Sequence, residues 1–212
     1  MQDSTAEARA LIDWSVAERT ISGERVSGDV YLIKPFEQRI LVAVIDGVGH
    51  GDEAAKAARR TVEILDTYAV ESGISLIKRC HEALLRTRGV VLTLAKLNTA
   101  ENTMTWLGVG NVEGRLYRAD AAAGHPRESV LLRGGLVGYQ LPALRASVIP
   151  VAPGDLLILA TDGIHTTFED GINSNATPRQ IADKILRWHF KGNDDALVLV
   201  LRYLGRQHEQ QT

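Results

Sequence analysis

The chain has 212 residues, of which 45% are hydrophobic and 24% charged, enough for a globular domain with a sizeable core. Its 24 Lys and Arg residues stand against 26 Asp and Glu residues, and the resulting net charge of -2 excludes a broad basic face for nucleic acid. The single cysteine, Cys80, excludes an intrachain disulfide and a cysteine-based zinc cage.

The sequence shows no segment that directs it to or through a membrane. No stretch approaches the roughly 18 apolar residues of a membrane span, and the first ten residues lack the basic-then-apolar pattern of a signal peptide. No linker rich in proline and glycine divides the chain. We therefore expect a single cytoplasmic domain over residues 1–212, with its core at about residues 10–202 between polar tails, and no nucleic-acid or membrane partner.

The first part of the chain predicts strands followed by two helices. Apolar runs at 11–16 and 30–33, the latter ending before Pro35, predict two strands, and the run at 40–45 predicts a strand buried on both faces. Between residues 52 and 70 apolar residues recur every three or four positions, which predicts an amphipathic helix. Gly73 interrupts this helix, and a second one is expected to end at 88–89.

The rest of the chain predicts further strands, one helix and a closing strand. The strands expected at 90–97, 103–109 and 112–117 are typical of a meander. Thr177 and Pro178 predict the N-cap and first turn of a helix that ends near 191–192. Because the helices are grouped and do not alternate with the strands, we expect an α+β protein with antiparallel sheets. The remaining predicted strands are 129–132, 145–151, 156–160 and 195–203.

Four acidic positions share one setting, at the end or the start of a predicted strand. A carboxylate beside a buried strand is costly unless a cation or hydrogen bonds compensate it, and the neighbouring glycines let the backbone approach a ligand. The available ligands are oxygens, which suit Mg²⁺ or Mn²⁺ and disfavour zinc and copper. Each motif alone is more often a turn, whereas together they predict a metal site. The positions are Asp29, Asp46, Asp162 and the pair Asp194–Asp195.

The motifs around these aspartates resemble those of the metal-dependent protein Ser/Thr phosphatases, the PPM family, in its bacterial sporulation and stress-response branch. Within that branch the sequence is most similar to the RsbX-type phosphatases. The combination of DGVGHG with PGD and TDGI is specific, whereas SGD alone is weak. The matching motifs follow the family order over nearly the whole chain: SGD at 27–29, DGVGHG at 46–51, GVGN at 108–111, PGD and TDGI at 153–164, and NDDA at 193–196.

The resemblance implies a four-layer α-β-β-α sandwich, with two antiparallel sheets flanked by helix pairs, and two Mn²⁺ or Mg²⁺ ions. It implies that Asp46 bridges both ions and that the carbonyl of Gly47 binds one of them. It further implies that Asp162 and Asp194 bind the second ion. Asp29 is implied close by, either as a direct ligand or through water.

The sequence departs from the family pattern in two places. The threonine that follows the Asp-Asp-x element in the family is Leu197 here, so a hydrogen bond behind the metal ligands is expected to be missing. No residue clearly matches the phosphate-binding arginine of the eukaryotic relatives, and Arg25 is the nearest in sequence. Asp195 is expected to point away from the metal ions or to form a local hydrogen bond, because neighbouring residues of a strand face opposite sides.

His50 has two interpretations. Histidine is the side chain that titrates nearest neutral pH, so His50 is a candidate catalytic acid that protonates the leaving serine oxygen. The other interpretation, which the sequence favours slightly, is a hydrogen bond in the turn before the helix. The glycine-rich segment 134–142 is either a specificity loop beside the metal site or an ordinary connection.

The resemblance implies a phosphatase that removes phosphate from phosphorylated STAS-domain proteins of the stressosome and so resets stress signalling. One alternative is the same chemistry on a phosphorylated anti-sigma-factor antagonist. A second is an interaction module that has lost turnover, which the four retained aspartates disfavour. A third is a hydrolase of small phosphoesters. A monomer is favoured, although the sequence leaves the oligomeric state open.

Overall fold

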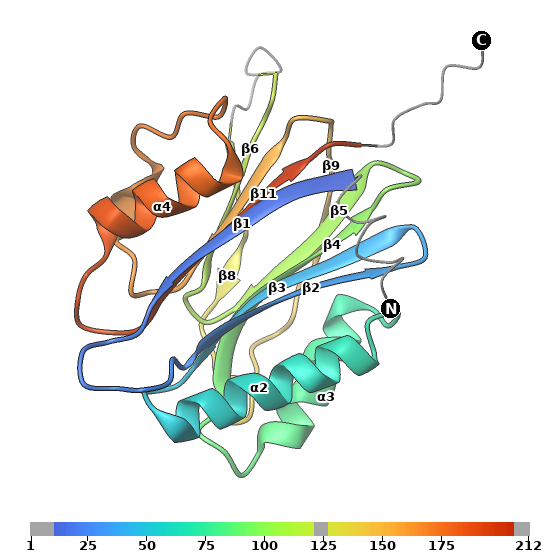
Figure 1. Ribbon diagram of the computed structural model, residues 1–212. Coiled ribbons are helices and arrows are strands. Elements are labelled where there is room, and N and C mark those ends of the chain that lie inside the picture. Colours follow the sequence, from blue (N-terminus) through green and yellow to red (C-terminus); the bar gives the residue numbers. More distant parts are fainter. Residues whose placement is uncertain (1–10, 121–126, 206–212) are drawn as a thin grey trace.

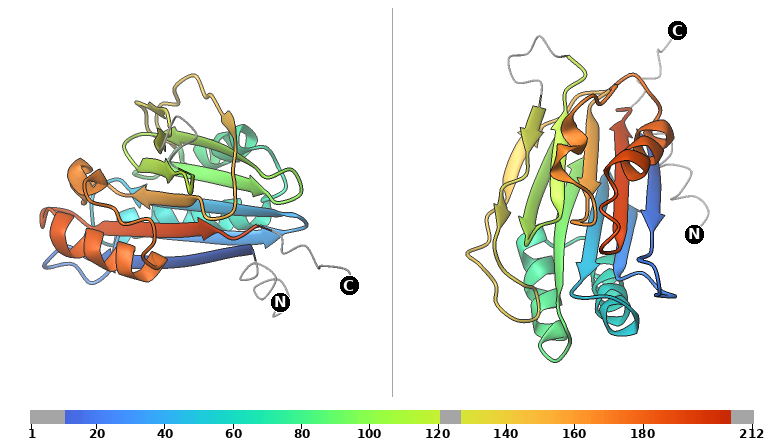
Figure 2. Two further views of the ribbon diagram at one scale, coloured as in Figure 1. Left: turned by 90° about the horizontal axis from the view of Figure 1, so that it is seen from above. Right: turned by 90° about the vertical axis from the view of Figure 1, so that its left-hand side faces the viewer.

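Two β-sheets packed face to face form the middle of the molecule, and helices cover their outer faces (Figures 1 and 2). The computed structural model describes residues 11–120 and 127–205. In this part of the chain no helix is long and apolar enough to cross a membrane. The architecture confirms the expected α+β sandwich of two mostly antiparallel sheets.

The first sheet contains the first and last strands of the described chain, which are antiparallel neighbours. A single helix, α4 (Pro178–His189), and a 3-10 helix, η2 (Thr166–Glu169), cover its outer face. In the described residues one α-helix and a short 3-10 helix therefore stand on this side in place of the expected helix pair. In spatial order the strands are β1 (Ile12–Arg19), β11 (Ala196–Tyr203), β10 (Leu156–Ala160), β6 (Glu113–Tyr117) and β7 (Arg127–Ser129).

The second sheet is covered by the helix pair α2 (Asp52–Thr67) and α3 (Gly73–Leu84) (Figure 1). Its pairs are antiparallel except for the short parallel pair β5–β8, and β9 pairs with β5 beside β8. In spatial order the strands are β2 (Asp29–Phe36), β3 (Arg39–Gly47), β4 (Val90–Asn98), β5 (Thr103–Val109) and β8 (Leu132–Arg133), with β9 (Ser147–Pro150).

The core has three parts, one between the sheets and one under each helical layer. The strand β3 shows how one strand contributes to two parts of the core, because its successive side chains point to opposite faces of the sheet. Val42 and Val44 lie between the sheets, whereas Leu41 and Ala43 lie under α2 and α3. All of these side chains are fully buried, as the doubly apolar run predicted. Cys80 is also buried, in the core under the helix pair.

Several predicted boundaries differ from the structure. β2 continues through Pro35 to Phe36, because β2 is an edge strand and proline's missing N–H costs no ladder hydrogen bond on its open side. Gly73 is the first residue of α3 and does not merely interrupt a helix, since the Ser72 side chain accepts a hydrogen bond from the Ser75 N–H and caps it. The N-terminus of α4 confirms the prediction, with Thr177 as N-cap in a capping box.

The predicted meander is wrong at its third strand. β4 and β5 form a hairpin, but β6 lies in the opposite sheet, where it pairs with β10. The chain changes sheets at Gly110, whose φ of 95° is accessible to glycine at little cost. The predicted strand 129–132 is likewise divided between β7 of the first sheet and β8 of the second.

Candidate metal centre

The predicted acidic residues come together at one end of the sandwich. Asp29 opens β2 and Asp46 nearly ends β3, and the two residues are paired across this antiparallel ladder. Asp162 follows β10 and Asp194 precedes β11, which are antiparallel neighbours in the other sheet. Antiparallel pairing therefore places a strand end beside a strand start in each sheet.

Hydrogen bonds join the two sheets at this end. Thr161, directly after β10, donates its hydroxyl hydrogen to Oδ2 of Asp29 at 2.7 Å. The carboxylate of Asp195 accepts the N–H of Gly28 at 2.7 Å and the N–H of Ile21 at 2.8 Å. The four aspartates of the candidate site therefore form one cluster that neither sheet contains alone.

Burial and mutual repulsion act on these carboxyl groups together. Burial, and then repulsion by the carboxylates of Asp29, Asp162 and Asp194, raises the pKa of Asp46 far above its usual range. The pKa of Asp29 is also raised, first by burial and then by the neighbouring acids, although the hydrogen bond from Thr161 opposes this rise. Burial is likewise the largest cause that raises the pKa of Asp194. A cluster of this kind is stabilised by a cation.

Two glycines make the close packing behind the carboxylates sterically feasible. A Cβ atom on Gly47 would lie 2.2 Å from the carbonyl oxygen of Ala54 in α2. A Cβ atom on Gly163 would lie 2.0 Å from the carbonyl oxygen of Asp195. Both contacts are with backbone atoms that a side chain cannot push aside cheaply, which explains why glycine follows Asp46 and Asp162 in the two motifs.

Asp194 and Asp195 have different surroundings, which separates their roles. Asp195 is 3% exposed, and its carboxylate is occupied by the two backbone donors described above. These bonds are long-range, so the expectation of a local hydrogen bond was wrong for Asp195. Asp194 is half-buried, accepts only the N–H of Asp195 at 2.9 Å, and lies near Asp162. Asp194 therefore has the carboxylate that is available to a ligand.

Sequence reasoning missed two residues that orient the acids. Thr161 accepts the N–H of Leu197 at 2.8 Å while it donates to Asp29, so a threonine on a neighbouring strand forms a hydrogen bond behind the cluster although position 197 is leucine. Asn111 donates from its side chain to Oδ2 of Asp162 at 2.8 Å. Thr161 and Asn111 both lie within motifs that carry the family resemblance, and this position in the motifs is the signal that could have identified them.

Several polar residues lie around this cluster. Nδ1 of His50 lies 2.6 Å from Oε1 of Glu24, so its partner belongs to the β1–β2 connection and not, as expected from the sequence, to the turn before α2. The imidazole remains 61% exposed near Asp194. Lys191, missed by sequence reasoning, donates from Nζ to the carbonyl of Asp162 at 2.5 Å. Arg25 is exposed and forms no hydrogen bond or ion pair within the described residues.

The ligand chemistry of the cluster fits a hard divalent cation, because all its donors are oxygens. No three acidic, histidine or cysteine side chains in the described residues are close enough to enclose an ion by themselves. An ion here would complete its shell with water and backbone carbonyl oxygens, as Mg²⁺ commonly does. The cluster therefore fits a partly hydrated ion and does not form a closed cage of side chains.

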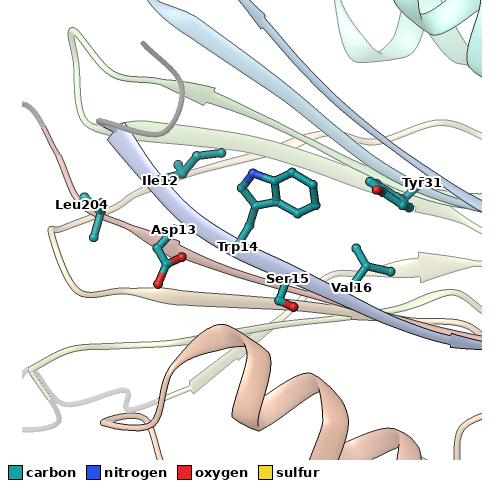
Figure 3. Close-up of a pocket in the computed structure, with 7 residues that line it drawn as sticks. All are labelled: Ile12, Asp13, Trp14, Ser15, Val16, Tyr31 and Leu204. Atoms are coloured by element: carbon teal, nitrogen blue, oxygen red, sulfur yellow. The ribbon is translucent and has the colours of Figure 1, made fainter. Parts of the chain in front are cut away.

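A cavity of about 700 Å³ lies elsewhere, at the open edge between β1 and β2 (Figure 3). Trp14 and Tyr31 approach each other across it, with ring centroids 5.8 Å apart, while Asp13 and Ser15 point to the opposite face of β1. None of the clustered aspartates lines this cavity. Its size therefore says nothing about the chemistry of the acidic cluster.

Comparison with known proteins places this geometry among phosphatases. The family model described as stage II sporulation protein E (SpoIIE) matches residues 37–204. The phosphoserine phosphatase RsbX of Bacillus subtilis (strain 168) is 25% identical over 186 residues, which cover 86% of this chain and 90% of that protein.

Two solved structures have the same fold over most of their length. A structure of the bacterial stressosome, described as a modular system adapted to control secondary messenger signalling, has a TM-score of 0.81 and 27% identity, covering 90% of this chain and 99% of that chain. A crystal structure of RsbX in complex with magnesium has a TM-score of 0.79 and 21% identity, and the match covers 91% of this chain and 96% of that chain.

Proposed function

This chain belongs to the SpoIIE family, and from this premise we propose that it is a metal-dependent phosphatase of phosphoserine and phosphothreonine in STAS-domain proteins of a stressosome. The observation that carries the proposal is the convergence of Asp29, Asp46, Asp162 and Asp194 at one end of the sandwich. The similarity to the phosphoserine phosphatase RsbX and to a stressosome structure supports the reaction and the substrate class.

Two Mg²⁺ or Mn²⁺ ions are the cofactors of this proposal. Asp46 and the carbonyl of Gly47 would hold the first ion, and Asp46, Asp162 and Asp194 the second, with Asp29 contributing directly or through water. When bound, such ions screen the negative charge of a phosphate ester and make a water molecule acidic enough to attack phosphorus near neutral pH. The magnesium found with the similar RsbX structure supports this choice of metal.

Side chains of this protein would orient the metal ligands and donate the proton to the leaving serine oxygen. Asn111 and Thr161 hold Asp162 and Asp29 in place through hydrogen bonds. His50 is the candidate acid for the leaving serine oxygen, because its exposed imidazole lies near Asp194 and is oriented by Glu24. A non-catalytic interaction module would have no need for four mutually repelling carboxylates, so their retention favours turnover.

Removal of divalent ions tests the proposal directly. Phosphate release from a phosphorylated STAS-domain protein should fall to background after exhaustive EDTA treatment and return when Mn²⁺ is added. The thermal unfolding temperature should rise with Mn²⁺ concentration, because the ion binds the folded cluster and relieves its repulsion. Activity that survives complete metal removal would contradict the proposed site.

The segment 134–142 bears on substrate choice. It is joined to the start of β4 by the Val90–Val137 bridge, beside Gly47 at the end of β3. Its turn is closed by two hydrogen bonds between Leu136 and Gln140, which leave Tyr139 78% exposed. The segment therefore holds an aromatic side chain in solvent at the same end of the sheet as the acidic cluster.

Tyr139→Ala should raise the KM for a phosphorylated STAS-domain protein about tenfold, because a well-placed aromatic contact contributes about 1–2 kcal/mol. The KM for p-nitrophenyl phosphate should not change, since this compound is too small to reach Tyr139. Trp188→Ala is the matched control, because Trp188 is 68% exposed on α4, which covers the other sheet. An equal effect on both substrates would argue against a role of this loop in specificity.

A further inference from the structure

Arg88 lies on the turn between α3 and β4, against the loop that follows Asp46. The carbonyl of the next residue, Gly89, accepts the N–H of Val48, two residues after Asp46, at 3.1 Å. A Cβ atom on Gly49 would lie 2.5 Å from Nη1 of Arg88, so the guanidinium is packed against the bare α-carbon of this glycine. The backbone and the side chain of Arg88 thus both lie against the loop that follows Asp46.

The backbone that follows Arg88 is also hydrogen-bonded to the segment 134–142. Val90 exchanges two backbone hydrogen bonds with Val137, both at 3.0 Å. Gly138 donates its N–H to Nδ1 of His81 in α3 at 3.1 Å, so the segment 134–142 is attached to the helix as well. These contacts hold the turn in place and reduce the entropy lost when Arg88 binds a ligand.

The guanidinium of Arg88 has no partner of its own. It is exposed, and it forms no hydrogen bond or ion pair with any residue that the structure describes. Glu53, an acid whose pKa Arg88 helps to lower, is itself paired with Lys56 at 2.6 Å, and Lys56 is the main cause of that lowering. All five guanidinium donors therefore remain available.

Lys191, another cation at this end of the sandwich, is already engaged. Lys191 donates from Nζ to the carbonyl of Asp162 and from its backbone N–H to the carbonyl of Gly163. It therefore supports the loop that contains Asp162. Among the described residues Arg25 and Arg88 both keep free donors, but the Arg88 guanidinium is the one packed against the loop that follows Asp46. Its planar fork suits the oxygens of a phosphate group.

We propose that Arg88 binds the phosphoryl group of the substrate at the rim of the acidic cluster. The inference rests on the proposed phosphatase function and adds a substrate-binding residue to it. An arginine here offers two parallel hydrogen bonds to a phosphoryl group that approaches Asp46 across Gly49. It would also counter the repulsion between an anionic ester and the clustered carboxylates.

The experiment compares Arg88→Gln, Arg88→Lys and Arg86→Gln in the Mn²⁺-loaded protein. Arg86 is an exposed arginine of the same turn, with no hydrogen bond or ion pair in the described residues, so it controls for the charge change alone. Three quantities are measured: kcat/KM with a phosphorylated STAS-domain protein, kcat/KM with p-nitrophenyl phosphate, and the inhibition constant of inorganic phosphate. Thermal unfolding shows whether each variant remains folded.

Arg88→Gln should lower kcat/KM about 10- to 100-fold for both substrates and weaken inhibition by inorganic phosphate to a similar extent. For Arg88→Lys both kcat/KM and the inhibition by phosphate should lie between those of Arg88→Gln and the wild type, because lysine keeps the positive charge but lacks the planar guanidinium. Arg86→Gln should behave like the wild type.

Four results would overturn the inference. An unchanged inhibition constant for phosphate in folded Arg88→Gln would show that Arg88 does not contact the phosphoryl group. An equal loss in Arg86→Gln would show a general charge effect. A wild-type protein that hydrolyses neither substrate with Mn²⁺ would refute the proposed function and this inference with it, whereas an active wild type with a normal Arg88→Gln variant would refute the inference alone.

Discussion

Asp46→Asn should lower the turnover of phosphoserine hydrolysis by about 10³-fold, because this substitution removes the charge of the residue proposed to bind both ions. Metal-ion catalysis contributes several kcal/mol to the transition state, and about 4 kcal/mol corresponds to this factor. The measurement is kcat at saturating Mn²⁺ with a phosphorylated STAS-domain protein. The metal-free variant should be at least as stable as the wild type, since it carries one carboxylate fewer in a repelling cluster.

Asp52→Asn is the matched control for this variant. Asp52 is an exposed aspartate in the first turn of α2, six residues after Asp46, and the same change of charge there should leave kcat within about twofold of the wild type. If Asp46→Asn turned over substrate at a near-normal rate, Asp46 would not be a metal ligand.

Asp194→Ala should mainly reduce activity and Mn²⁺ binding, whereas Asp195→Ala should mainly reduce stability. Asp194→Ala should lower kcat at least about 100-fold and weaken Mn²⁺ binding, because it removes an available carboxylate from the cluster. Its free energy of unfolding without metal should stay within about 1 kcal/mol of the wild type, since its hydrogen bond is with the N–H of the next residue.

Asp195→Ala should instead lower the free energy of unfolding by about 2–4 kcal/mol. The substitution leaves the N–H groups of Gly28, in a buried place, and Ile21, in a partly buried one, without their acceptor, and the bond to Gly28 joins the two sheets. Mn²⁺ affinity and kcat measured well below its unfolding temperature should change less than in Asp194→Ala. A larger loss of Mn²⁺ affinity in Asp195→Ala would reverse the assignment of the two residues.

The sequence by itself predicted most elements of the fold and the candidate residues of the site. Buried strands and amphipathic helices are defined by hydrophobic periodicity, which is local, so β3 and α2 could be predicted from their own residues. The cap of α4 follows from Thr177 and Pro178 for the same reason. The spacing of the aspartates at strand ends likewise predicted which acids belong to the candidate site, because strand direction brings such ends together.

Sheet membership and the partners of the site residues were decided only by the tertiary structure. An alternating strand such as β6 fits either sheet of a sandwich, and its partner is chosen by long-range packing that leaves no local signal. The hydrogen bonds of Asp195 also leave no local signal, because its carboxylate oxygens accept N–H groups from near the other end of the chain. Nor does the sequence show that Thr161 forms a hydrogen bond behind the cluster although position 197 is leucine. Arg88 opens the segment 88–93, which resembles RsbX-type sequences, but only the packing of its turn against Gly49 shows an unpaired cation beside the loop that follows Asp46. Hydrogen-bond and charge partners across a fold depend on the sheets being assembled, and that assembly is a property of the whole chain.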